Sequence, residues 1–206
     1  MQPDTQPDKA TSIGGELGRF VLNDKWVVLS NDFDAIKPHW LALQEKAAIT
    51  IYQHYYWQKA WYETLGQAEA GQALFILVLE SGQAELLIPL VLVKKHGLTL
   101  ARFMGADHAN YKFPLLATSA ATQYNSALTP QLLAALKKNL PVPVDVLELT
   151  GQPLAWEGIE NPVARKLRAR ASATNGRSVS LTPDFNALLQ RGNAKRKRKI
   201  LRAQER

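Results

Sequence analysis

Two long apolar stretches, separated by a short polar turn, dominate the middle of the chain. Residues 73–80 and 84–93 are almost entirely aliphatic, and the three residues at 81–83 stand between them. Because the turn contains a glycine, which adopts the positive φ angle that tight turns need, the pattern predicts a β-hairpin. The nearly continuous hydrophobicity predicts strands that are covered on both faces, so helices must lie on each side of the sheet. Pro89 lacks an N–H and predicts a bulge or an unpaired edge.

The rest of the chain alternates between the periodicities of strands and helices. Strands are expected at 25–31, 98–105, 144–151 and 176–182, and helices at 32–47, 52–66, 129–141, 161–171 and from Thr182 onward. In the third of these helices Thr129 is the expected N-cap and Pro130 the first helical residue. The order of elements predicts an α/β (α+β) fold with a mixed, largely antiparallel sheet and helices on both faces.

The helix expected at 52–66 is the most aromatic part of the chain. Trp57, Trp61 and Leu65 fall at i, i+4 and i+8 on one face, and Gly66 stands where a left-handed residue commonly ends a helix. Aromatic residues at this spacing favour packing against the sheet. Because Trp and Tyr offer flat apolar rings with polar atoms, a sugar-stacking platform is the alternative.

The basic charge of the chain is confined to its last sixteen residues. The formal net charge is +7, and residues 191–206, with eight Lys or Arg and one Glu, account for all of it. Such a segment can bind nucleic acid or an anionic membrane surface through counterion release, but a solvated helix face is the commoner origin. Ile200 and Leu201 follow the run at 195–199 and restart an apolar pattern. We therefore expect a helix that is interrupted, and nucleic acid is not the expected partner.

Composition excludes several classes of site and location. Cysteine is absent, which excludes disulfides and thiolate metal sites, and the four histidines show no ligand-like spacing, so no metal is expected. Residues 1–24 are polar and rich in Pro, Gly and Asp, and they predict a disordered leader rather than a signal peptide. The longest apolar run, 86–93, is far shorter than the ~20 residues of a membrane helix. We expect a cytoplasmic protein with no membrane span.

An irregular segment after the strand at 98–105 carries the candidate binding residues. Residues 106–117 show no periodicity, and functional side chains often collect in such loops. His108 can act as a base near neutral pH, Asn110 can orient a carbonyl group and Tyr111 can donate a proton. These three residues are the expected substrate-binding group, with Tyr111 as the strongest candidate. The alternative is a polar turn that satisfies its own backbone. No triad or paired-carboxylate spacing identifies catalytic residues.

Several features occur in an order that resembles one enzyme family. They are the helix with Trp57, Trp61 and Gly66, the strand with Pro89 and Leu90, the sequence Gly105…Asn110-Tyr111, and Phe185, Leu188 and Leu189 before the basic run Lys195–Arg202. Over residues 25–206 the chain resembles the N-terminal half of the CelD-like (BioF2-like) acetyltransferases, which are relatives of the FemAB aminoacyltransferases in the GNAT superfamily. Asn110 stands where the family pattern has an acid, so no charge role is carried over to it.

The resemblance implies an acyl-CoA-dependent acyltransferase that acts on a cell-envelope or exopolysaccharide precursor. In such an enzyme an amine or hydroxyl attacks the thioester, a backbone N–H polarises the carbonyl and a positioned group accepts the proton. The resemblance also implies that residues 25–183 form a GNAT-like N-terminal domain. Residues 184–206 would then form a basic helix that leads to a second GNAT-like domain, absent from this chain, with the acetyl-CoA or other acyl-CoA site.

The residues of this chain agree with a CoA site that lies elsewhere. A pyrophosphate site needs a glycine-rich turn that opens a helix. The nearest string, 102–107, ends in Asp107, which repels pyrophosphate, and the segment after it is not expected to open a helix. No cofactor site is therefore expected, and the chain alone is expected to be inactive. A non-catalytic module that binds substrate or a partner domain is the alternative function, and a nucleic-acid binder acting through the basic segment is a third.

Overall fold

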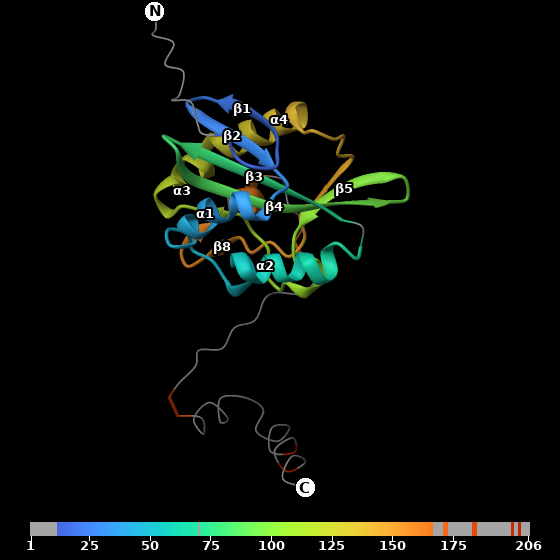
Figure 1. Ribbon diagram of the computed structural model, residues 1–206. Helices are drawn as coiled ribbons and strands as arrows, with labels where there is room; N and C mark the ends of the chain where they lie inside the picture. The colour runs from blue at the N-terminus through green and yellow to red at the C-terminus, as the bar shows by residue number, and fades with distance from the viewer. Residues whose placement is uncertain are drawn as a thin grey trace, which may run out of the picture. The chain divides into compact units, whose positions relative to one another are not determined.

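The computed structural model describes residues 12–69, 71–166, 171, 172, 183, 184, 199 and 202. The chain divides into two units, residues 1–170 and 171–206, and every element named below lies in the first (Figure 1). The strand predicted at 176–182, the helix predicted from Thr182 and the basic run at 195–199 lie outside the described residues, apart from the single positions given above. They stay predictions.

Within the described residues, seven strands form one mixed sheet (Figure 1). They are β1 (Glu16–Leu22), β2 (Lys25–Ser30), β3 (Gln72–Glu80), β4 (Gln83–Lys95), β5 (Leu98–Phe103), β6 (Leu115–Leu116) and β7 (Val146–Glu148). The order across the sheet is β1-β2-β3-β4-β5-β7, with β6 paired to β4. Neighbouring strands are antiparallel except β5 and β7, which are parallel. The predicted mixed, largely antiparallel sheet is confirmed.

The predicted central hairpin consists of β3 and β4. Ser81 and Gly82 join the two strands, and both have positive φ angles, 47° and 76°. A turn with two positive φ angles matches the right-handed twist of the strands that it connects. Gly82 therefore has the positive φ angle that the sequence predicted for the glycine of this turn.

Pro89 lies at a gap in strand pairing in the centre of the sheet. On one edge of β4, the pairing with β6 ends at Leu87 and the pairing with β5 begins at Leu90. The Pro89 carbonyl accepts a hydrogen bond from the backbone N–H of Met104 at 3.1 Å on this edge. Because the N and C=O of one strand residue point to the same edge, the missing N–H of Pro89 breaks no strand pair. Pro89 thus lies in a central strand at a position where one edge of β4 has no strand partner, and the register shift between β3 and β4 lies at residues 78–79.

Strand β1 corrects the expectation that residues 1–24 are a disordered leader. It pairs antiparallel with β2, and the guanidinium of Arg19 lies 5.5 Å from the centre of the Trp26 ring. The strand is at the edge of the sheet, and it leaves Leu17 and Val21 exposed. An edge strand with little burial carries a weak alternation of apolar and polar residues. For this reason its sequence is similar to that of a polar leader.

Helix α1 (Phe33–Gln44) begins at the start of the helix predicted at 32–47. The side chain of Asp32 accepts hydrogen bonds from the backbone N–H groups of Asp34, at 2.8 Å, and Ala35, at 3.2 Å. It thereby satisfies two of the donors that a helix N-terminus leaves free. On the buried face, Nε1 of Trp40 donates to the carbonyl of Gln53 at 2.9 Å. The helix is thus fixed both at its start and through its core side chain.

The aromatic helix is present, but its buried face differs from the predicted one. It consists of α2 (Tyr55–Trp61) and one π-helical turn, Tyr62–Gly66. Trp61 is 5% exposed, Trp57 is half-buried and Leu65 is 39% exposed. A π turn holds one extra residue, which rotates the residues after it relative to an α-helix. Leu65 is therefore turned away from the face that Trp61 buries.

Gly66 continues this helix instead of ending it in a left-handed conformation as predicted. It is not among the glycines with positive φ, and Gln67 after it has the helical angles −70° and −37°. A Cβ on Gly66 would lie 2.8 Å from Tyr62 and 3.0 Å from Trp61. The glycine is needed because these two rings lie so close to its backbone.

Helix α4 (Thr129–Asn139) also begins differently from its prediction. The chain is already helical in α3 (Ala121–Gln123) and in a π turn, Tyr124–Leu128. Thr129 has helical angles of −61° and −48° and therefore lies inside the helical path rather than at an N-cap. Pro130 has no N–H to donate to the preceding turn, which favours a wider turn at that point.

Helices cover both faces of the sheet, as the apolar strands predicted (Figure 1). The Trp40 ring of α1 packs on Phe75 of β3, with centroids 5.8 Å apart, whereas Leu136 of α4 and Leu74 of β3 line one cavity. Because successive strand residues point to opposite faces, α1 and α4 lie on opposite sides. Helix α5 (Pro162–Lys166) is the described start of the helix predicted at 161–171, and β8 (Ala155–Trp156) and β9 (Ile159–Glu160) form a small hairpin before it.

Candidate functional site

The candidate loop, residues 105–112, begins with a sharp turn after β5. Gly105 and Ala106 have φ angles of 93° and 38°, and the Gly105 carbonyl accepts hydrogen bonds from the backbone N–H groups of His108, at 2.8 Å, and Ala109, at 3.1 Å. A Cβ on Gly105 would lie 2.7 Å from Ala109 and 3.2 Å from the Trp57 ring. Glycine is required here because the loop turns back closely against α2.

The imidazole of His108 faces α2. His108 ends the short 3-10 helix η3 (Ala106–His108), and its Nδ1 accepts a hydrogen bond from Nε1 of Trp61 at 3.3 Å. An indole N–H can only donate, so Nδ1 carries no proton in this contact and the neutral ring holds its proton on Nε2. Because His108 is exposed, Nε2 can donate to a bound ligand.

Asn110 contacts the aromatic residues that precede α2. Its Nδ2 donates to the hydroxyl of Tyr52 at 3.0 Å, and Tyr52 belongs to the 3-10 helix η1 (Ile51–Gln53). The Tyr52 ring meets the Trp57 ring edge to face, with centroids 5.2 Å apart. Asn110 is exposed, so its amide oxygen can accept a hydrogen bond from a ligand beside these rings.

Tyr111 is held by its backbone and packs on a tryptophan that the sequence analysis did not select. Its carbonyl accepts a hydrogen bond from Nε2 of the buried Gln53 at 2.9 Å. Its ring lies against Trp156 of β8, with centroids 5.3 Å apart and planes tilted by 41°. Among the described residues, the buried Nε1 of Trp156 has no hydrogen-bond partner. No local pattern around Trp156 marks it as a partner of Tyr111.

The three predicted residues thus lie in one loop, but each contacts a different aromatic residue, and these partners come from three different elements. Within the described part of the chain, His108, Asn110 and Tyr111 form no hydrogen bond with one another or with a carboxylate. The loop therefore offers aromatic rings beside an amide and an imidazole, which suits the apolar faces and hydroxyls of a sugar. It contains no paired acid and base of the kind that proton transfer uses. Their role in substrate binding stays a prediction.

Lys112 supports this loop from the inside and was missed by the sequence analysis. Its residue is 6% exposed. The ammonium donates to the Ala106 carbonyl at 2.6 Å, and the backbone N–H donates to the Gly151 carbonyl at 3.0 Å. Burial lowers the pKa of Lys112, and the nearby carboxylate of Asp107 acts in the opposite direction. A lysine in a polar segment gives no local sign of burial, so only the fold identifies it.

Buried Lys112 should make the stability of the protein rise as the pH increases towards the pKa of an unfolded lysine. In the unfolded chain a lysine has a pKa of about 10.4, and burial lowers the pKa in the folded protein. Between the two values the unfolded state binds more protons, so the free energy of unfolding increases with pH. Lys112→Met removes this contribution. In urea unfolding, the stability of the wild type relative to the variant should increase from pH 8 to pH 10. A difference that stays constant, as expected for the exposed control Lys94→Met, would contradict the assignment.

A second cluster of polar groups, buried except for the half-exposed Glu80, links strands β2, β3 and β4. Lys25 is 3% exposed, and its ammonium lies 2.5 Å from the carboxylate of Glu80 and 2.9 Å from that of Glu85. The hydroxyl of the fully buried Tyr124 donates to Glu85 at 3.4 Å. Lys25 lowers the pKa of Glu80, whereas burial raises the pKa of Glu85. We call these four residues the buried ion cluster. It connects the ends of three strands to the turn before α4.

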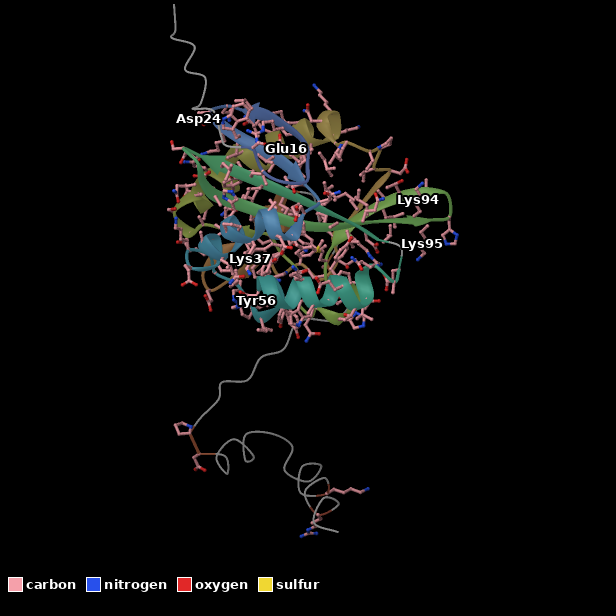
Figure 2. All side chains as sticks on the ribbon, viewed as in Figure 1. Glu16, Asp24, Lys37, Tyr56, Lys94 and Lys95 are labelled. Atoms are coloured by element: carbon pink, nitrogen blue, oxygen red, sulfur yellow. The ribbon has the colours of Figure 1, made fainter. Side chains whose placement is uncertain are left out.

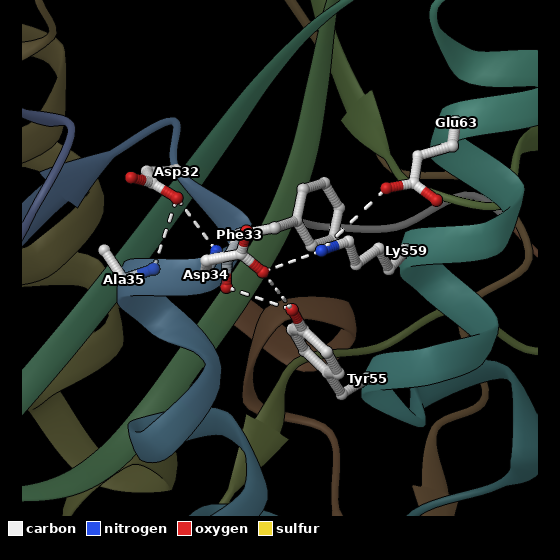
Figure 3. A network of polar contacts seen from close by, with 7 residues as sticks. All are labelled: Asp32, Phe33, Asp34, Ala35, Tyr55, Lys59 and Glu63. Atoms are coloured by element: carbon white, nitrogen blue, oxygen red, sulfur yellow. Dashed lines mark hydrogen bonds and ion pairs between the residues drawn. The ribbon is translucent and has the colours of Figure 1, made fainter.

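Figure 3 shows a third, exposed network that joins α1 to α2. The ammonium of Lys59 lies 2.7 Å from Asp34 and 3.9 Å from Glu63, and the hydroxyl of Tyr55 donates to Asp34 at 3.3 Å. The hydrogen bond from Lys59 lowers the pKa of Asp34. Exposed pairs of this kind stabilise a fold little. Their effect is to fix the position of α2, which carries Trp57 and Trp61 to the candidate loop.

Neither a metal site nor a membrane-spanning helix is found in the described residues. Among the residues that the structure describes, no group of three or more His, Cys, Asp or Glu is placed to hold a metal ion. No described helix combines the length and apolar character needed to cross a membrane. Comparison of the chain with protein-family models, with curated protein sequences and with solved structures found no match. The resemblance to CelD-like acetyltransferases therefore stays a prediction that rests on motifs of the chain.

Proposed function

We propose that the described domain binds the acceptor substrate in an acyl-CoA-dependent acyltransferase of the CelD-like (BioF2-like) type. The acceptor in this proposal is a saccharide of a cell-envelope or exopolysaccharide precursor. The observation that carries the proposal is the candidate loop, where the exposed side chains of His108 and Asn110 lie beside aromatic rings. Sugars are commonly held by this combination, because their C–H faces stack on rings and their hydroxyls need polar partners.

The position of the loop in the fold supports the same proposal. The loop directly follows β5, and β5 pairs in parallel with β7 at the edge of the sheet. The carboxyl ends of parallel strands meet at one end of a sheet, where ligands commonly bind in α/β folds. A mixed, largely antiparallel sheet is also what the family resemblance implies for the N-terminal domain. The strand order and the position of the loop are thus both consistent with the proposed acceptor-binding domain.

The turn at Gly105, which is the string of this chain nearest to a pyrophosphate loop, has features that oppose CoA binding. The turn at Gly105 leads into η3, which has three residues, and no helix forms at 109–114, in agreement with the sequence prediction. The carboxylate of Asp107 is exposed in this turn, and Arg102 is paired with Glu69. A pyrophosphate needs helix N–H donors and positive charge. This turn opens only the three-residue η3, and its exposed carboxylate repels an anion. In our proposal the second domain provides the acyl donor, and this domain contributes acceptor binding.

Each loop residue then has a defined part in acceptor binding. The rings of Tyr111 and Trp156 provide an apolar surface for a sugar face, and Asn110 and Nε2 of His108 provide an acceptor and a donor for its hydroxyls. His108 and Asn110 are each held by a hydrogen bond to an aromatic residue. Side chains held in place before binding lose less entropy when the ligand arrives.

Replacement of Tyr111 by Ala should weaken saccharide binding about tenfold, which corresponds to about 1.4 kcal/mol. The reason is loss of the ring that stacks on the sugar, so Tyr111→Phe should keep most of the affinity. Titration calorimetry with a β-linked N-acetylglucosamine tetrasaccharide measures both. Lys94→Ala, at the tip of the β4–β5 hairpin (Figure 2), is the matched control and should bind like the wild type. Equal affinity in Tyr111→Ala and the wild type would place the sugar elsewhere.

A non-catalytic binding module is the second candidate function, and the same geometry favours it. The loop lacks a paired acid and base, and its turn at Gly105 has features that oppose CoA binding. The two candidate functions differ in what they require of the rest of the protein. An acceptor-binding domain works with an acyltransferase domain, whereas a binding module needs none. Acetyl-CoA added to this chain should bind no more tightly than millimolar in either case. A micromolar site of one-to-one stoichiometry would overturn the assignment of the acyl donor to a second domain.

A further inference from the structure

A cavity of about 290 Å³ lies between α4 and the face of the sheet opposite α1. Its floor is formed by Leu74, Ile76, Ile88 and Leu90 of β3 and β4, and its roof by Leu133 and Leu136 of α4. Aliphatic side chains therefore form most of the lining of this cavity, which is partly open to solvent. Such a lining offers water no hydrogen-bond partners, so it favours an apolar ligand.

Polar groups meet this cavity at its lip. Lys137 of α4 and Asp145 before β7 both line the opening. The carboxylate of Asp145 already accepts a hydrogen bond from the backbone N–H of Thr99 at 2.8 Å. Lys137 is exposed, and among the described residues no carboxylate lies within ion-pair distance of its ammonium. The opening thus presents two charges beside an aliphatic interior: the carboxylate of Asp145, which is held by the backbone of Thr99, and the ammonium of Lys137, which has no ion-pair partner among the described residues.

We propose that this cavity binds a single aliphatic chain with an anionic head group, and that Lys137 pairs with the head. The volume of about 290 Å³ equals that of about ten groups the size of water, at about 30 Å³ each, and a methylene is of similar size. A carboxylate chain of about ten carbons therefore fits. The carboxylate of Asp145 is already held by the backbone N–H of Thr99, whereas the ammonium of Lys137 is free to form an ion pair. An anionic head is therefore favoured over a neutral or a cationic one. The site shares no residue with the candidate loop, so it is independent of the saccharide proposal.

Chain length gives the first test of the site. The wild-type chain is titrated by calorimetry with hexanoate, octanoate, decanoate and dodecanoate, each below its micelle concentration. Each added methylene buried in the cavity should tighten binding about fourfold, and the gain should stop near ten carbons, where the volume is filled. Decyltrimethylammonium should bind at least tenfold more weakly than decanoate. No binding of decanoate, an affinity that does not depend on chain length, or equal affinity for the two heads would overturn the proposal.

Variants locate the ligand in this cavity. Ala101 of β5 lines the cavity, so Ala101→Leu fills part of it and should weaken decanoate binding at least tenfold with an unchanged or raised thermal midpoint. Leu133→Trp, which adds volume from the helix side, is a second route if the first variant is unfolded. Lys137→Ala should weaken binding about threefold at low ionic strength and less at high salt. Lys138→Ala, also exposed but outside the lining, is the matched control.

The variants also separate the ligand from other occupants. Folded Ala101→Leu or Leu133→Trp that binds decanoate like the wild type would place the fatty chain elsewhere and overturn the proposal. The wild type could instead fail to bind decanoate and form a dimer in sedimentation, while Leu133→Trp stays monomeric. That result would assign the cavity surface to a second copy of the chain and would also overturn the proposal. If neither variant folds, the series of chain lengths and head groups with the wild type decides.

Discussion

Replacing Lys25 by Met is expected to lower the free energy of unfolding by about 3–5 kcal/mol at pH 7–8. The ammonium is the positive member of the buried ion cluster, and it lies within 2.9 Å of both Glu80 and Glu85. Without it, two carboxylates remain close together with no cation, and Glu85 is nearly buried. The charge of a buried carboxylate without a partner is the most unfavourable part of such a change. Urea unfolding followed by tryptophan fluorescence measures the loss.

The effect of this substitution should shrink in acid, because Glu85 can take up a proton. Burial already raises the pKa of Glu85, with Lys25 opposing that rise. Removing Lys25 raises the pKa further, so the variant should recover part of its stability towards pH 5. The double variant Lys25→Met with Glu85→Leu should also be less destabilised than Lys25→Met alone, since it removes the unpaired charge.

Lys46→Met is the matched control for the buried ion cluster. Lys46 is an exposed lysine whose ammonium contacts the amide oxygen of Gln83 at 3.4 Å. Surface changes of this type usually alter stability by less than about 0.5 kcal/mol. If Lys25→Met unfolds at the same urea concentration as Lys46→Met, the cluster is open to water in solution and does not support the strand ends.

The strands that the sequence predicted most clearly are those that are buried on both faces. β3 and β4 are long apolar runs, because α1 and α4 both cover them, and the turn at Ser81 and Gly82 has an unambiguous glycine signal. β1 was missed, because an edge strand with exposed Leu17 and Val21 has no continuous apolar run. A long apolar run therefore indicates a strand that is buried on both faces, whereas the more exposed β5 and β7 were predicted from shorter patterns.

Helix ends were predicted less well than helix positions. The side chain of Asp32 caps α1 at the first residue of the helix predicted at 32–47. Gly66 and Thr129 carry the residue types of an end and a start, yet both lie inside helical paths that include a π turn. Capping residues mark an end only if the chain outside them leaves the helix. At these two sites packing of Trp61 against Gly66, and the missing N–H of Pro130, decide the local geometry instead.

The candidate site could be located from the sequence only as a loop. A segment without periodicity after a strand identified His108, Asn110 and Tyr111, and the structure places all three in one loop. Their partners come from distant positions, such as Trp156 for Tyr111, and Lys112 is buried within a polar segment. Contacts between residues far apart in the sequence depend on strand order. No spacing along one chain encodes them, which is why the buried ion cluster was also missed.

Truncation of Trp61 to Ala is expected to destabilise the protein by about 3–5 kcal/mol, because it removes a large buried ring and leaves a cavity. Trp61 is 5% exposed and belongs to the main hydrophobic core. The free energy of unfolding of an ordinary domain is only about 5–15 kcal/mol, so the variant should melt far below the wild type or aggregate. Thermal unfolding followed by circular dichroism measures this directly.

Tyr56→Ala is the control for this change on the same helix. Tyr56 is 62% exposed, and Figure 2 labels it together with Lys37. The centre of its ring lies 5.2 Å from that of the Tyr55 ring and 5.3 Å from the ammonium of Lys37. Cation–π contacts at exposed sites contribute about 0.5–1 kcal/mol, so the midpoint should fall only slightly. Loss of stability as large as in Trp61→Ala would show that the exposed face of α2 is covered in solution.

Trp61→Phe separates packing from the hydrogen bond to His108. The smaller ring keeps much of the buried area, but it has no N–H to donate to Nδ1 at 3.3 Å. The loss in stability should therefore be much smaller than for Ala, and the proton of neutral His108 becomes free to occupy either ring nitrogen, which nitrogen chemical shifts report. Trp61→Ala that melts like the wild type but loses saccharide affinity would mean that α2 is a ligand platform. In that case the tryptophan acts in binding, and its assignment to the core is wrong.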